Sequence, residues 1–344
     1  MNFPKKAAKI DIISIRIGSS LVTHRKIISI FLAISAFVFV QSTPGQGWRA
    51  HSIDATGDLV AIHFTTSRKG FVGGDNGYLA FTVDGGKTWR QYPLNTTEDI
   101  NEIYFRNEDN GYIVAGRKLF ITSDGGSSWR ETSILRDPLG GGQTPVFLSI
   151  RFADRRRGLA IGSVLNQQGR VVDSLVMRTA NGGESWDRMI VPSKAELFFI
   201  DFNGSSHGWI VGDKGLILAT TNGGETWQVQ NSNTTNALYN VDFRDDDVGY
   251  AVGEAGTILR TENGGRVWEK IKNDVTATLL RVVFTDDRNG WIIGRRGVIL
   301  HSRDKGRTWD QANGPTTKHL YGLYMSRRFG WAVGADGLLL EFRP

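Results

Sequence analysis

The sequence predicts an all-β protein, a seven-bladed β-propeller whose N-terminal strand closes the last blade. Three observations predict this fold. An eight-residue motif occurs six times, with its tryptophans mostly 40 or 41 residues apart. Two strand-like patterns occur seven times at the same period, which indicates a repeat architecture. The last repeat has no fourth strand, whereas a strand-like segment around Trp48 has no repeat of its own.

The eight-residue motif has the chemistry of a tight hairpin turn. In its first copy, residues 82–89, an Asp followed by two glycines supplies the positive φ angles that such a hairpin needs. The Asx side chain can accept hydrogen bonds from amides of its own turn, and the final Trp anchors the next strand in the core. This motif is the Asp-box, and we interpret it as a structural staple rather than a ligand site. Its Asx residues are Asp84, Asp124, Asn181, Asn222, Asn263 and Asp304.

Each repeat contains four predicted strands, counted from the propeller axis outward. The first is an apolar-x-Phe run such as residues 62–64, and the second is a Gly-aromatic-x-apolar-Gly segment such as residues 208–212. The third leads into the Asp-box, as in residues 216–220, and the fourth begins at the Asp-box Trp. Four short strands with turn signals between them are typical of a propeller blade. Since residues 338–342 end the seventh repeat without a fourth strand, we expect residues 47–49 to complete it and close the ring.

Residues 1–42 are predicted to be a signal peptide or membrane anchor, and residues 43–344 the propeller. Six Lys and Arg residues precede an apolar run at residues 27–40, whose length fits the core of a secretory signal better than a bilayer span. Cleavage after Ser42 is one expectation, and an uncleaved anchor is the alternative. In both cases the positive flank stays in the cytoplasm and the propeller is exported, to the periplasm or the cell exterior.

The composition excludes several functional classes. The net charge is +6, but most of this excess lies in the N-terminal segment, so the high pI reflects targeting rather than nucleic-acid binding. The sequence has no cysteine, which excludes disulfides, thiolate metal sites and lipid attachment through a cysteine. We predict no metal, no cofactor and no nucleic-acid partner.

Two insertions in the third repeat are candidate functional loops. Compared with the other repeats, they lengthen the connections at residues 135–145 and 163–174, which should open on the same face. Long loops on a rigid scaffold often carry function, although drift in tolerant surface loops explains them equally well.

The turns between the first and second strands should open on the opposite face, and their charge differs between repeats. Acidic residues occupy these turns at 245–247 and 286–287, whereas repeats seven, one and three carry basic residues. We predict that these basic turns, the basic arc, dock a charged protein or a headgroup surface, with an ordinary solvated face as the alternative. The basic arc consists of Arg68, Lys69, Arg155, Arg156, Arg157, Arg327 and Arg328.

The middle residue of each apolar-x-Phe run should face the propeller axis. Polar groups buried there must pair or contact water. Because Asp201 lies one repeat beyond Arg151, we predict a structural salt bridge between them, with a ligand-binding channel as the alternative. This axial ring consists of His63, Tyr104, Arg151, Asp201, Asp242, Val283 and Tyr324.

We predict no catalytic residues. Glycosidases need paired carboxylates, and sialidases need a tyrosine nucleophile with an arginine cluster. Sialidases carry Asp-boxes, but their Arg-Ile-Pro or Arg-Leu-Pro signature is absent, and seven blades exceed their usual six. Xyloglucanases with Asp-boxes use two propellers, and this chain has one. A carbohydrate-active or glycan-binding propeller is therefore the alternative function.

The full repeat resembles that of the photosystem II stability/assembly factor-like propellers. It reads apolar-x-Phe, then Gly-Trp-x-Val-Gly-x-x-Gly-x-Ile-Leu-x-Thr-x-Asx-Gly-Gly-x-x-Trp, and the resemblance covers residues 48–342. It implies a photosynthesis-related scaffold of the thylakoid lumen or periplasm that binds a newly made membrane-protein subunit without catalysis. We therefore expect an exported assembly factor with a protein partner, and membrane contact through the N-terminal segment if that segment is retained.

Overall fold

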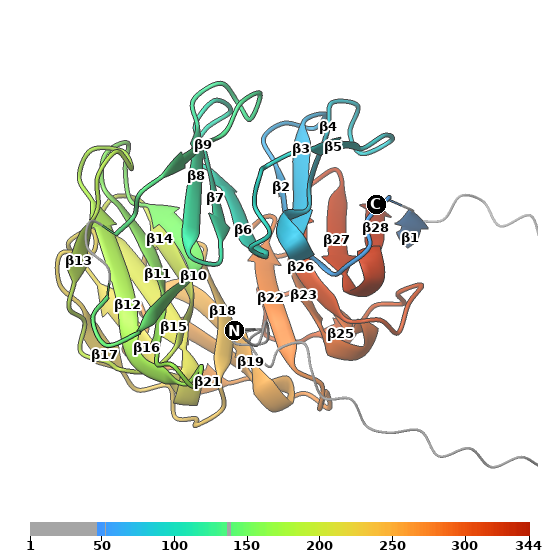
Figure 1. The fold of residues 1–344 in the computed structure, drawn as a ribbon. Helices are drawn as coiled ribbons and strands as arrows, with labels where there is room; N and C mark the ends of the chain where they lie inside the picture. Colours follow the sequence, from blue (N-terminus) through green and yellow to red (C-terminus); the bar gives the residue numbers. More distant parts are fainter. Residues whose placement is uncertain (1–46, 52, 136–138) are drawn as a thin grey trace, which may run out of the picture. The chain divides into compact units, whose positions relative to one another are not determined.

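The computed structural model describes residues 47–51, 53–135 and 139–344. Their strands form seven four-stranded antiparallel sheets. The innermost strand of each sheet contacts that of the next, and the last contacts the first, so the sheets form a closed ring (Figure 1). The predicted seven-bladed β-propeller is confirmed. The predicted signal or anchor segment, residues 1–42, lies outside the described residues, and no helix among the described ones is long and apolar enough to cross a membrane.

The blades follow one another along the chain, and the first six have their four strands in sequence order from the axis outward. The first four consist of β2 (Leu59–Phe64), β3 (Gly70–Gly74), β4 (Leu79–Thr82) and β5 (Arg90–Tyr92); β6 (Ile100–Phe105), β7 (Gly111–Ala115), β8 (Lys118–Thr122) and β9 (Arg130–Thr132); β10 (Thr144–Phe152), β11 (Gly158–Leu165), β12 (Val171–Thr179) and β13 (Asp187–Met189); β14 (Leu197–Asn203), β15 (His207–Gly212), β16 (Ile217–Thr220) and β17 (Gln228–Gln230).

The last three blades follow the same order, except that the N-terminal strand provides the outermost strand of the seventh. They consist of β18 (Leu238–Phe243), β19 (Val248–Gly253), β20 (Ile258–Glu262) and β21 (Glu269–Lys270); β22 (Leu279–Phe284), β23 (Gly290–Gly294), β24 (Ile299–Ser302) and β25 (Asp310–Gln311); β26 (Leu320–Met325), β27 (Gly330–Gly334), β28 (Leu339–Arg343) and the N-terminal β1 (Gly47–His51).

Strand β1 closes the ring as the sequence predicts. It pairs antiparallel with β28, from Gly47 opposite Arg343 to His51 opposite Leu339. Trp48 is only 7% exposed, and its ring lies 5.3 Å from that of Phe342 and 5.8 Å, edge to face, from that of Trp291 in blade six. The N-terminal strand therefore joins blade seven and also packs against blade six.

Five of the turns between second and third strands contain a short 3-10 turn with a positive-φ residue in its middle. In the turn after β19 a Cβ on Gly256 would lie 1.7 Å from the Val275 carbonyl oxygen, so only glycine lets this turn approach the next connection. These turns are η1 (Asp75–Gly77), η2 (Asp213–Gly215), η3 (Glu254–Gly256), η4 (Arg295–Gly297) and η5 (Ala335–Gly337).

The hydrophobic core lies between adjacent blades. One cluster joins Tyr112 and Leu119 of blade two to Phe147, Phe152 and Trp186 of blade three, all nearly inaccessible to solvent. Burial at this scale, about 25 cal/mol per Å² of apolar surface, is what holds the blades in a ring without disulfides.

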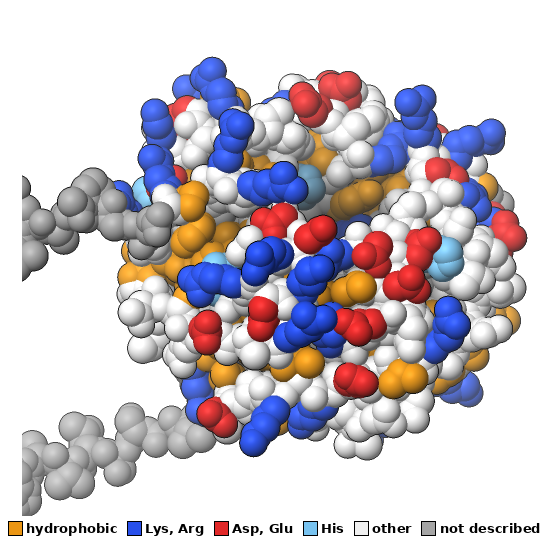
Figure 2. Space-filling view, turned by 180° about the vertical axis from the view of Figure 1, so that it is seen from behind, with side chains coloured by type: hydrophobic (Ala, Val, Ile, Leu, Met, Phe, Trp, Pro, Cys, Tyr) orange, Lys and Arg blue, Asp and Glu red, His pale blue; other side chains and the backbone are white. Residues whose placement is uncertain are grey.

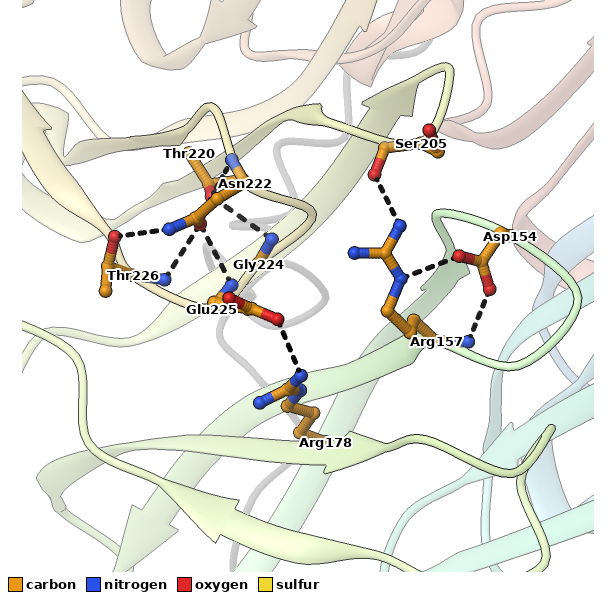
Figure 3. A network of polar contacts seen from close by, with 9 residues as sticks. All are labelled: Asp154, Arg157, Arg178, Ser205, Thr220, Asn222, Gly224, Glu225 and Thr226. Atoms are coloured by element: carbon orange, nitrogen blue, oxygen red, sulfur yellow. Dashed lines mark hydrogen bonds and ion pairs between the residues drawn. The ribbon is translucent and has the colours of Figure 1, made fainter.

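The Asp-box octets form the turns between third and fourth strands, and their side chains saturate the turn with hydrogen bonds. In blade four the Thr220 hydroxyl donates to Asn222 (2.8 Å) and accepts the N–H of Gly224 (3.1 Å), while Asn222 Oδ1 accepts the N–H of Thr226 (3.0 Å; Figure 3). The same bonds recur at Asp84, where the N–H of Gly85 also donates to the Arg68 carbonyl oxygen (2.8 Å). Each such bond ties an Asp-box to the first turn of its own blade.

Replacing Asp124 by Ala should lower Tm by a few degrees and leave partner affinity unchanged, because the lost bonds are local to one exposed turn. Hydrogen bonds from Ser128 and Thr122 lower the pKa of Asp124 from 3.8 to about 2. A carboxylate with a lowered pKa stabilises the fold above its unfolded pKa, so the difference from wild type should vanish as the pH falls from 3.8 to about 2. Thermal melts over this range check the prediction, and Asp84→Ala should behave alike. Loss of affinity at unchanged Tm would contradict the staple interpretation.

The insertions in blade three lengthen its strands instead of forming free loops. Thr144 pairs with Leu165 and Pro145 with Val164, and the β11 extension also pairs with β12, leaving a short turn around Asn166. Residues 136–138 of the first insertion lie outside the described residues. The sequence predicted longer loops because the extra residues can be counted from the repeat, whereas the pairing of the two insertions with each other cannot.

Most of the apolar residues in these insertions pack into the core, although Val172 is 38% exposed. Val164 is fully buried and Leu165 is 6% exposed, while Leu135 and Leu139 pack against the cluster between blades two and three. Hairpin extension therefore leaves little apolar surface at these four residues for a partner.

Candidate functional site

A polar cavity of about 150 Å³ lies among the innermost strands. All members of the predicted axial ring except Tyr104 line it: His63, Arg151, Asp201, Asp242, Val283 and Tyr324. Tyr104 lies next to the cavity, with its ring centre 4.8 Å from the Arg151 guanidinium. Six of the seven axial-ring residues therefore line one cavity, and the seventh, Tyr104, packs against one of these six, Arg151.

A second layer of axial residues escaped the sequence analysis. It lies two positions earlier in each innermost strand, on the same strand face because side chains alternate. The signal in the sequence is the residue two positions before each member of the axial ring. Its members are Ala61, Glu102, Ser149, Phe199, Asn240, Arg281 and Gly322, of which all but Ser149 line the cavity.

The ion-pair partner of Arg151 is Glu102, from this second layer, and not Asp201 as predicted. Arg151 Nη1 lies 2.5 Å from Glu102 Oε1, and Glu102 Oε2 accepts the N–H of Ile150 at 2.8 Å. Asp201 instead accepts the N–H of Phe243 at 2.9 Å. Burial alone would lower the pKa of Arg151, but Glu102, Tyr104 and Asp201 together outweigh it and raise the pKa.

Asp and Asn side chains at the axis connect successive blades. Asp242 accepts the N–H of Phe284 at 3.1 Å, and Asn240 accepts that of Val282 at 2.9 Å, in the same way that Asp201 accepts that of Phe243. These bonds satisfy backbone donors that a parallel neighbour strand leaves open. The cavity side chains thus hold the ring together.

Burial shifts the protonation of several axial groups. It lowers the pKa of His63 to about 3, with a further contribution from Arg151, so the imidazole is neutral. It lowers the pKa of Arg281 to about 10 and raises the pKa of both Asp201 and Asp242. The charge of Asp201 raises the pKa of Asp242 further.

Replacing Asp242 by Asn should stabilise the protein at pH 8 by about 1–2 kcal/mol. An acid with a raised pKa holds its proton in the folded state after the unfolded chain has lost it, so wild-type stability falls as the pH rises from 3.8 towards about 8. Asn keeps an oxygen for the N–H of Phe284 and does not titrate in this range. Denaturant unfolding at pH 5 and pH 8 checks this, with a variant advantage expected only at the higher pH; an equal difference at both pH values would contradict the shift.

The cations of the basic arc differ in whether their side chains are bonded to the protein. Arg157 and Arg156 are fixed: Arg157 Nε pairs with Asp154 at 2.6 Å and its Nη2 donates to the Ser205 carbonyl oxygen (Figure 3), while Arg156 Nε donates to the Ala180 carbonyl oxygen. Half-buried Lys69 lies 6.0 Å from the Phe71 ring centre. The others are exposed, and within the described residues their side chains have no ion pair or hydrogen bond: Arg68, Arg155, Arg327 and Arg328.

The basic arc is interrupted at blade two. The turn after β6 lies between the turns of blades one and three and carries exposed Glu108 and Asp109. On the acidic side, Asp245 and Asp286 accept backbone N–H groups of their own turns, and Asp287 pairs with Arg244 at 2.8 Å. Figure 2 shows one face of the molecule, where basic and acidic side chains lie interspersed. The charge separation is thus weaker than the sequence pattern suggests.

Comparisons with known proteins place the chain in a family. The family described as "Photosynthesis system II assembly factor YCF48" matches residues 40–142, 89–194, 179–237 and 225–318. Together these matches cover most of the chain, so the protein belongs to the YCF48 family. No curated protein matches it.

Several solved structures share the propeller fold. One, "YCF48 bound to D1 peptide", is 22% identical with a TM-score of 0.70 over 86% of this chain and 97% of that one. YCF48 from Cyanidioschyzon merolae is 19% identical with a TM-score of 0.68, over 87% and 99%. Virginiamycin B lyase from Staphylococcus aureus is 11% identical with a TM-score of 0.70, over 86% and 99%. At these identities the likeness concerns the fold, which assembly factors and enzymes share.

Within residues 47–51, 53–135 and 139–344 no group of three or more His, Asp or Glu side chains is placed to hold a metal ion.

Proposed function

We propose that this protein is an exported, non-catalytic assembly factor that binds a protein partner, a membrane-protein subunit under assembly. The observation that carries the proposal is membership of the YCF48 family. A structural neighbour that is itself a YCF48 protein is bound to a D1 peptide. This favours a peptide segment of a photosystem subunit as the partner. The basic N-terminal residues followed by an apolar run support export to a lumen or periplasm.

We place the partner on the basic arc, and above all on its unpaired cations. Arg68, Arg155, Arg327 and Arg328 are exposed, and their guanidinium groups are free to meet carboxylates of a partner. Their turns are already ordered, since the Arg68 carbonyl oxygen is bonded to the Asp-box of the same blade. A preformed turn loses less conformational entropy on binding than a flexible loop does.

Binding through the basic arc should weaken steeply as salt concentration rises, because exposed charges are screened within about 8–10 Å at physiological ionic strength. With a peptide of the D1 subunit as probe, changing Arg68, Arg155 and Arg328 together to Glu should weaken binding about tenfold or more at low salt. Isothermal titration from low to high salt measures both effects. Lys214→Glu, an exposed cation of η2 in a turn between second and third strands, is the control and should bind normally. A flat salt response with unchanged affinity of the triple variant would remove the site from the basic arc.

The non-catalytic part of the proposal is supported by what the axial carboxyl groups do. Glu102, Asp201 and Asp242 each accept a backbone N–H of the next blade, so they are committed to ring closure. Incubation with sialylated and xyloglucan oligosaccharides should therefore release no product, as followed by mass spectrometry. Turnover that disappears in Asp242→Asn would establish a glycosidase instead.

A further inference from the structure

A pocket of about 500 Å³ lies between blades four and five, away from both the axial cavity and the basic arc. Trp209 and Ala219 of blade four lie at its base, and Gln228 and Gln230 of the outer strand β17 form one wall. The opposite wall comes from blade five, with Asp246 and Asp247 of its first turn and the Asp-box that contains Asn263.

The pocket exists because blade four has a small residue at one position of its third strand. In each of the seven described blades, this position is paired with the large second-strand residue that packs against the next blade. The pairs are Phe71 with Phe81, Tyr112 with Ile121, Leu159 with Arg178, Trp209 with Ala219, Tyr250 with Arg260, Trp291 with His301 and Trp331 with Glu341. Blade four alone among these pairs has alanine. The pocket opens beside the partly exposed Ala219, whereas Trp209 itself is only 1% exposed.

Arginine side chains fill the equivalent space in the two neighbouring blades. Arg178 of blade three extends to the next Asp-box and pairs with Glu225 at 3.3 Å (Figure 3). Arg260 of blade five lies 6.0 Å from the Tyr250 ring centre, pairs with Glu262 and donates to the Lys305 carbonyl oxygen at 3.2 Å. The fold therefore shows twice how a guanidinium group fits between a second-strand side chain and the following Asp-box.

The charges around the open pocket suit a cation. Asp246 and Asp247 are both exposed, and Asp247 makes no side-chain ion pair or hydrogen bond within the described residues. Asp246 bonds to Asn203 and lies 3.2 Å from His207 Nδ1. The pocket also contains Arg266, but its Nε donates to the carbonyl oxygen of Asn263 in its own turn.

We propose that this pocket binds an arginine side chain of a protein partner, which takes the place that Arg178 and Arg260 fill in the neighbouring blades. The guanidinium group enters beside Ala219, next to the buried Trp209, and pairs with Asp247, with Asp246 beside it. The carbonyl oxygen of Gly264, equivalent to the acceptor of Arg260, already accepts hydrogen bonds from Trp209 and Gln230, so the carboxylates provide the main polar contact. Arginine suits the space better than lysine because it is planar and can pair in a bidentate way.

The test uses the full chain and the peptide acetyl-Gly-Arg-Gly-amide, with the citrulline peptide as an uncharged isostere. In an NMR titration up to about 10 mM, the arginine peptide should shift amides of residues 226–231 and 263–266, and the citrulline peptide should bind about tenfold more weakly or not at all. Ala219→Arg, which fills the pocket from within, should weaken arginine-peptide binding about tenfold or more while Tm stays at or above that of wild type. Asp247→Asn should weaken it about threefold to tenfold, whereas Glu108→Gln, an exposed acid in the first turn of blade two, should not.

Three outcomes would overturn the proposal: no binding by wild type, equal binding of the citrulline peptide, or unchanged binding by a folded Ala219→Arg protein. Shifts of the same amides by xyloglucan oligosaccharides, but not by the arginine peptide, would assign the pocket to a glycan. The Arg68, Arg155 and Arg328 triple variant should bind the arginine peptide as wild type does, so this result is separate from that of the basic arc.

Discussion

Replacing Trp48 by Ala should lower the free energy of unfolding by about 3–5 kcal/mol, as expected for removal of a buried Trp. Trp48 is 7% exposed and contacts Phe342 of its own blade and Trp291 of blade six, so its loss opens a cavity at the join between the chain's two ends. A chain that begins at Ala50 should lose at least as much, because it also lacks the hydrogen bonds of β1 at that end. Denaturant unfolding measures both effects.

Arg49→Ala is the matched control for Trp48→Ala, since the neighbouring side chain is exposed in the same strand. Its unfolding free energy should stay within about 0.5 kcal/mol of wild type. If the Trp48→Ala protein or the chain that begins at Ala50 melted like wild type, closure by the N-terminal strand would not contribute to stability.

Replacing Glu102 by Ala should cost about 3–5 kcal/mol, because it leaves Arg151 buried without its counter-charge. The same change removes the acceptor for the N–H of Ile150. Glu98→Ala in the same blade is the control, since Glu98 also pairs with an arginine, Arg117, at 2.7 Å, but in a pair whose side chains are 25% and 59% exposed. That pair should contribute no more than about 1 kcal/mol.

A second substitution separates the charge effect from lost packing. Adding Arg151→Met to Glu102→Ala removes the uncompensated cation and should recover about 1–3 kcal/mol of the loss. Equal destabilisation by Glu102→Ala and Glu98→Ala would show that the axial ion pair is solvated and does not bind the blades together.

The blade architecture was predictable because each blade repeats the same local signals. Asx-Gly turns, the buried Trp and the period near forty residues all indicate the same element, and the missing strand at one end matches the extra strand at the other. Local turn chemistry and burial agree here with the global fold, which is the condition for reading a fold from one sequence.

The contacts of the axial residues were predictable only in part. The period places Arg151 on the axis, but its choice of Glu102 over Asp201 depends on the offset between layers of neighbouring strands. The pocket beside Ala219 was not predicted either, since its signal is a small residue where the other blades have larger ones. Such an absence is visible only after the blades have been aligned strand by strand.

The pairing of β1 with β28 also determines when the molecule can finish folding. Trp48 must find Phe342, nearly the whole chain away, and contacts of such sequence separation form late and slowly. Blades one to six are built from consecutive strands and can form as the chain emerges, but the seventh must wait for the final residues. Until then β1 and β28 expose unpaired edges, which favour association with other chains. We expect completion of the seventh blade to remove both edges and so to lower the tendency of the chain to associate.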